Sequence, residues 1–130
     1  MRTLCLQFQP YRAPKISVEQ LSALLLRIAM AEKGIREFTV QRNRSAKYIN
    51  YLFAGTSVGG IWSAVRVGAL HHRIFGASLR RACITTAEGS QGWHNYLLLH
   101  HFDPKQALNK PRVSNKLRIV AARSRGKIRG

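Results

Sequence analysis

Apolar and polar residues alternate in short stretches along this chain, and such alternation predicts β-strands with one buried face. In residues 3–9, Leu4, Leu6 and Phe8 alternate with polar neighbours. Prolines at positions 10 and 14 end this stretch. Four later stretches are also predicted as strands: residues 36–42, 48–53, 79–86 and 96–102.

Two segments have helical spacing instead. Ser17 and Gln20 have the spacing of a capping box, and the apolar residues that follow recur every three or four positions, which predicts a helix from residue 18 to about 33. The same spacing in Ile61, Val65 and Ala69 predicts a second helix over residues 60–75.

The resulting order β, α, β, β, α, β, β predicts an α+β fold. It matches a ferredoxin-like antiparallel sheet with two helices on one face, an extra C-terminal hairpin strand and a basic tail. With 130 residues, the chain is long enough for one core. We expect a single domain over residues 1–103 and a basic extension over residues 104–130.

Charge adds the largest constraint on partners. The chain has 22 Lys and Arg residues against 5 Asp and Glu residues, which gives a net charge of +17. Such self-repulsion destabilises a compact state without counter-charge, so a polyanion is the expected partner. Nucleic acid, with RNA favoured over DNA, supplies the densest phosphates; an acidic protein is the alternative.

Several cationic groups are candidate phosphate contacts. Arg42, Arg44 and Lys47 fall in one predicted turn, which is either a phosphate site or a solvated loop. Further candidates are Arg66 and Arg73, seven apart on the predicted helix, and Arg80 and Arg81. After Asp103 no acid occurs, and the basic extension adds Lys110, Arg112, Lys116, Arg118, Arg123, Arg125, Lys127 and Arg129.

Tyr51 is a candidate for stacking on an RNA base. The pattern does not decide which face of residues 48–53 is buried. If the face with Tyr51 is exposed, it offers a stacking surface beside the basic turn.

A glycine-rich segment joins the third predicted strand to the second helix. Gly55 and Gly60 have the spacing of a phosphate loop, but Ile61 and Trp62 replace the required Lys and Ser or Thr, which argues against nucleotide hydrolysis. The N-terminus of the helix either binds one phosphate or is capped by a hydroxyl group. The candidate phosphate-binding residues are Thr56, Ser57, Gly59 and Gly60.

Histidines are the candidates for catalysis. A metal-independent ribonuclease needs a general acid and a general base, which His94 with His100 or His101 could supply. The five carboxylates have no paired spacing, and no metal or cofactor motif is present. Cys5 and Cys83 form no framework, which indicates a reducing setting such as the cytoplasm.

A membrane span is not expected. Residues 48–65 carry no charge, but glycines and polar side chains interrupt them, and the N-terminus does not resemble a signal peptide.

The sequence therefore predicts a small, non-catalytic RNA-binding protein, such as a ribonucleoprotein or ribosome component. The first alternative is a toxin-like ribonuclease that uses the histidines. The second is an inhibitor or interaction module that binds an acidic or nucleic-acid-binding protein.

Overall fold

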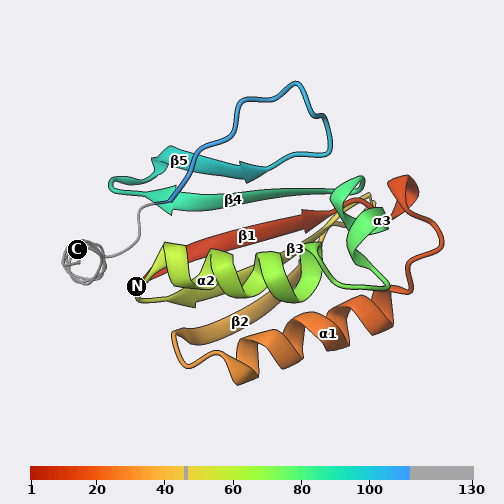
Figure 1. Ribbon diagram of the computed structural model, residues 1–130, viewed down its shortest axis with the longest axis horizontal. Helices are drawn as coiled ribbons and strands as arrows, with labels where there is room; N and C mark the ends of the chain where they lie inside the picture. The colour runs from red at the N-terminus through yellow and green to blue at the C-terminus, as the bar shows by residue number, and fades with distance from the viewer. Residues whose placement is uncertain (46, 112–130) are drawn as a thin grey trace, which may run out of the picture.

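The computed structural model describes residues 1–45 and 47–111 and contains an α+β fold with an antiparallel sheet of five strands and three α-helices (Figure 1). The elements in chain order are β1 (Arg2–Phe8), the short helical turn η1 (Pro10–Arg12), α1 (Val18–Ala31), β2 (Ile35–Arg42), β3 (Ile49–Gly55), α2 (Val58–Val65), the π-helical turn η2 (Arg66–Leu70), α3 (Gly76–Arg80), β4 (Cys83–Gly89) and β5 (Gly92–His100).

The strands lie in the order β2-β3-β1-β4-β5. Their register aligns Arg42 of β2, Ile49 of β3, Phe8 of β1 and Cys83 of β4 in one row across the sheet. We call this end, where β2 turns into β3, the hairpin end. The opposite end, where β1 and α2 begin, is the N-terminal end (Figure 1).

The two faces of the sheet differ in burial. Leu4, Leu6 and Phe8 of β1 are fully buried and join the side chains of α1 and α2 in one core. α1 contacts β2, while α2 contacts β1 and β3. We call the other face the outer face; its side chains are Thr39, Gln41, Asn50, Leu52, Cys5, Gln7, Ile84 and Thr86, all of them exposed or half-buried.

The helix predicted over residues 60–75 is confirmed only as far as Leu70, because α2 continues directly into η2 and the helical segment ends there. α2 ends at Val65, and the chain widens into the π-helical turn, where the His71 N–H donates to the Arg66 carbonyl. The His72 ring then accepts the N–H groups of Ile74 and Phe75 through Nδ1, which stops the helix and starts a new turn. Side-chain capping of this kind is not visible in hydrophobic spacing.

Two strand boundaries also differ from the prediction. Leu79 is buried in α3 and not in a strand, so β4 begins only at Cys83. β5 begins at Gly92, four residues before the predicted start, and ends at His100. Gly92 has a φ of 76°, which allows the tight turn from β4.

The first part of the basic extension returns to the sheet. The Asn109 N–H donates to the Leu98 carbonyl at 2.7 Å, and the Leu98 N–H donates to the Asn109 side chain at 2.8 Å. The chain therefore returns to β5 at Asn109.

Candidate nucleic-acid interface

The turn between β2 and β3 presents three of the predicted cations to solvent. Asn43 closes the turn, because its side-chain oxygen accepts the Tyr48 N–H at 3.1 Å and its amide donates to Ser45 at 2.6 Å. Arg42, Arg44 and Lys47 are all exposed around this closed turn. The turn therefore presents three exposed cationic groups at the hairpin end.

The tertiary structure adds more cations at the same end. Arg81 lies two residues before Cys83, the first residue of β4, which is in the row of Arg42. Three strand spacings of about 4.8 Å separate Arg42 from Cys83, so the backbones of these two residues lie roughly 14 Å apart. Arg66, where α2 passes into η2, and Arg73, before α3, are also exposed.

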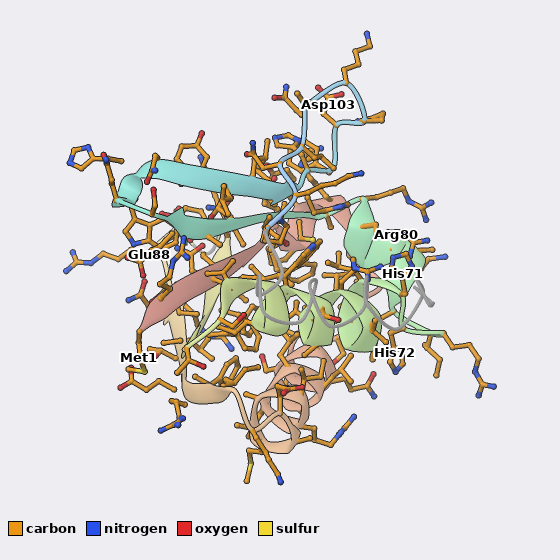
Figure 2. All side chains as sticks on the ribbon, turned by 60° about the vertical axis from the view of Figure 1, so that its left-hand side comes forward. Met1, His71, His72, Arg80, Glu88 and Asp103 are labelled. Carbon is orange, nitrogen blue, oxygen red and sulfur yellow. The ribbon has the colours of Figure 1, made fainter. Side chains whose placement is uncertain are left out.

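Arg80 does not behave as the sequence suggested. It lies in α3 and not in a strand, and its guanidinium donates to the Leu70 carbonyl. Its own carbonyl accepts from the His100 ring at 2.8 Å. Arg80 and His71 lie on the same side of the molecule (Figure 2). Arg80 therefore ties α3 to η2 and β5, and this half-buried side chain is less available to a phosphate than Arg81.

Sequence reasoning missed Arg12 and Lys15. With Arg81 and Ser78 they line a small cleft of about 190 Å³ at the hairpin end. The Arg12 guanidinium lies 3.6 Å from the centre of the Phe102 ring, which is close enough for a cation–π contact. Arg12 and Lys15 lie near Arg81 only because η1 and α3, which are far apart in the sequence, come together in the fold. No local sequence pattern indicates this contact.

The glycine-rich segment lies at the N-terminal end and lines a cleft of about 560 Å³. Thr56, Ser57 and Gly59 line this cleft, together with the predicted Lys110 and the unpredicted Arg2, whereas Gly60 does not. The Arg2 guanidinium donates to the Glu88 carbonyl at 2.9 Å, and its buried Nε has no acceptor in the described part of the chain.

The hydroxyl group of Ser57 caps α2. Its oxygen accepts the Gly60 N–H at 3.2 Å, and the Ser57 carbonyl accepts the Ile61 N–H. Within the described residues, the N–H groups of Val58 and Gly59 have no acceptor. The Ser57 hydroxyl group therefore caps the N–H of Gly60, as one of the two interpretations predicted. The N–H groups of Val58 and Gly59 are left as possible donors to an anion in the cleft.

The predicted phosphate contacts do not form one site. β1 separates Arg2, in the cleft, from Phe8, in the row of Arg42, by roughly 20 Å at about 3.3 Å per residue. The structure therefore provides two cationic regions, the hairpin end and the N-terminal cleft, which one extended ligand would have to span.

Tyr51 cannot stack on a base, so that prediction is wrong. Its side chain is fully buried, its hydroxyl group bonds to Ser22 at 2.7 Å, and Phe38 stacks on its ring at 6.3 Å. Burial raises the pKa of Tyr51. The opposite face of β3 carries the half-buried Asn50 and Leu52, and the half-buried Tyr48 lies just before this strand.

The histidines do not form an acid–base pair. His94 is exposed near the start of β5 and His100 lies at its end, so six residues of strand separate them by roughly 20 Å. The Nδ1 atom of His101 accepts the Asp103 N–H at 2.9 Å. The pairing of His94 with His100 that the ribonuclease alternative offers is therefore not formed.

His100 makes stability sensitive to acid. Burial lowers its pKa, and the charges of His101, Arg80 and His71 act in the same direction, against the hydrogen bond to the Arg80 carbonyl. The unfolded imidazole gains a proton near pH 6.5 while the folded one resists it, so stability falls as the pH drops below about 6.5. We expect His100→Gln to reduce the loss of melting temperature between pH 7.5 and pH 5.0.

His94→Gln is the matched control, because it removes an exposed histidine from the same strand and leaves the contacts of His100 in place. Circular dichroism melting curves of the three proteins measure the effect. An unchanged pH dependence in His100→Gln would contradict this role of His100.

Neither thiol is primed for nucleophilic chemistry. Burial raises the pKa of Cys5 to about 11 and that of Cys83 to about 12. Both side chains therefore stay protonated at neutral pH, Cys5 as a half-buried and Cys83 as a buried residue of the sheet.

Three further findings bound the site. Among residues 1–45 and 47–111, no group of three or more His, Cys, Asp or Glu side chains is placed to hold a metal ion. None of the helices in that part of the chain has the length and apolar character needed to cross a membrane. The predicted contacts Arg112, Lys116, Arg118, Arg123, Arg125, Lys127 and Arg129 lie outside the described residues.

Fold and surface together define an α+β protein with a five-stranded antiparallel sheet and a cationic end. No protein-family model, curated protein or solved structure matches this chain.

Proposed function

We propose that this protein binds single-stranded RNA without cleaving it, and that the hairpin end is the main contact with phosphate groups. The observation that supports this most directly is the gathering of exposed cations from separate parts of the sequence at one end of the sheet: Arg12, Lys15, Arg42, Arg44, Lys47 and Arg81. Such a cluster costs free energy by self-repulsion unless an anion lies against it.

We infer that the fold is ferredoxin-like, with α1 and α2 on the buried face and β5 added at one edge. The strand order β2-β3-β1-β4 and the single core support this topology. The fold leaves the outer face free for a ligand, although the fold alone implies no function.

The N-terminal cleft is a second anion contact in this proposal. Arg2, Lys110 and the two free N–H groups of α2 would hold one phosphate. A ribonucleoprotein or ribosome component suits a net charge of +17, because permanent RNA supplies the missing counter-charge.

The test is a salt titration of the full chain against labelled single-stranded and duplex RNA, followed by a gel of the same RNA. We expect tighter binding to the single strand, a steep fall in affinity with salt, and intact RNA. Absence of RNA binding at low salt would contradict the proposal and favour an acidic protein as partner. Cleaved RNA would contradict the non-catalytic role.

A further inference from the structure

We propose that one nucleotide of a single-stranded RNA binds at η1, with its base stacked on Tyr11 and its phosphate held in the small cleft beside Arg12. This inference rests on the proposed RNA binding and assigns the bases a contact that the cations alone do not provide. Tyr11 lies at the hairpin end, directly after β1, and 63% of its surface is exposed. It is therefore open to a ligand, unlike the buried Tyr51.

Backbone hydrogen bonds hold η1 against the start of β4. The Gln9 N–H donates at 2.8 Å to the carbonyl of Ala82, the residue before β4. The Arg12 N–H donates to the Gln9 carbonyl at 3.0 Å, which closes a turn around Tyr11. Tyr11 is thus carried by a hydrogen-bonded turn that is tied to the sheet.

Side-chain contacts also order this turn. The Oε1 atom of Gln9 accepts from the Tyr11 hydroxyl group at 2.9 Å and from Arg12 Nε at 2.7 Å. The Arg12 guanidinium lies 5.5 Å from the centre of the Tyr11 ring and 3.6 Å from that of Phe102. A ring and a guanidinium that are ordered before the ligand arrives lose less conformational entropy on binding.

The cleft of about 190 Å³ offers the place for the phosphate. Arg12, Lys15 and Arg81 bring three cations to it, Ser78 adds a hydroxyl group, and none of its lining residues is acidic. Since the Arg12 side chain bonds to Gln9 through Nε, its two terminal nitrogens have no acceptor among the described residues. Guanidinium and hydroxyl donors are common partners of phosphate oxygens.

The position of Arg12 favours a nucleotide of a single strand as the occupant. Arg12 both lines the cleft and lies beside the Tyr11 ring, so a phosphate on Arg12 would lie next to a base on Tyr11. One sugar joins these two groups in a nucleotide. An acidic peptide would use the cations without needing the ring, and a duplex keeps its bases stacked inside the helix. Stacking accepts any base, so no sequence preference is expected.

Fluorescence anisotropy of the full chain, with one labelled RNA of mixed sequence as a single strand and as a duplex, tests the inference. We expect Tyr11→Ala to weaken binding of the single strand roughly tenfold and to leave the affinity for the duplex unchanged. The dependence of single-strand affinity on salt should stay the same, because no charge is removed. Tyr11→Phe retains the ring and should bind as the wild type does.

Arg12→Gln tests the phosphate half of the site. Loss of one phosphate contact should lower the slope of log affinity against log salt by about 0.7 for the single strand. An unchanged slope in this variant would overturn the assignment of the phosphate to the cleft.

Tyr96→Ala is the matched control for the stacking half. Tyr96 is 55% exposed on β5, where the register places it toward the N-terminal end of the sheet. Wild-type affinity of Tyr11→Ala for the single strand, or an equal loss in Tyr96→Ala or with the duplex, would overturn the inference while RNA binding itself stands. Failure of the wild type to bind the single strand at low salt would overturn the proposed function as well, so the two failures are distinguishable.

Discussion

Replacing Arg42, Arg44 and Lys47 together with Gln is expected to weaken binding to single-stranded RNA about a hundredfold at 0.1 M salt. Each phosphate that a cation neutralises releases counterions and contributes about 0.7 to the slope of log affinity against log salt for a single strand. Three lost contacts should therefore lower this slope by about 2. Asn43 is retained in this variant, because it closes the turn.

The matched control removes the same charge elsewhere. Arg27, Lys33 and Arg36 are also exposed, but they lie on α1, after α1 and near the start of β2. Their joint replacement with Gln should change the affinity far less. Filter binding at several salt concentrations measures both triple variants. Equal losses in the two would mean that net charge alone drives binding and that the hairpin end has no special role.

Gly55→Ala is expected to destabilise the fold by about 2–3 kcal/mol. A Cβ atom at this position would collide with the backbone carbonyl of Gly34 and would lie 3.2 Å from Ile61 Cδ1. Gly55 pairs with Ile35 at a register shift of the sheet, so the backbone on that side cannot simply move away. The midpoint of urea unfolding, followed by circular dichroism, measures the loss.

Gly60→Ala is the control within the same glycine-rich segment. A Cβ atom there would meet only Ser57, at 3.6 and 3.7 Å, which are ordinary contacts. Because alanine favours the helix over glycine, this variant should raise stability by up to about 1 kcal/mol. If both variants unfolded at the wild-type midpoint, close packing would not explain Gly55, and the phosphate-loop interpretation of its spacing would regain weight.

The positions of the strands were largely predictable, because alternation follows from the geometry of a strand. Leu4, Leu6 and Phe8 occupy the core as their spacing indicates. The same alternation could not say which face of β3 is buried, since Tyr51 and Tyr48 are equally suitable for either face. Burial of Tyr51 is decided by Phe38 and Ser22, which belong to other elements.

The sequence predicted that the candidate site is cationic, but it predicted only some of the residues that form it. The sequence identified the turn with Arg42, Arg44 and Lys47, because neighbours in a turn stay neighbours in space. It could not show that Arg81 is exposed while the guanidinium of the neighbouring Arg80 donates to the Leu70 carbonyl. Arg2 and Arg12 were missed, because their places depend on contacts with β4 and with residues that follow β5.

The sequence by itself determined the strand faces of β1, the capped start of α1, the basic turn and the net charge of +17. These properties depend on residues that are close in the chain. Only the tertiary structure decided that the cations predicted to contact phosphate divide between two ends of the sheet, and that His94 and His100 lie apart. Each of these depends on strand order and register, which arise from long-range packing of the core that local periodicity does not encode.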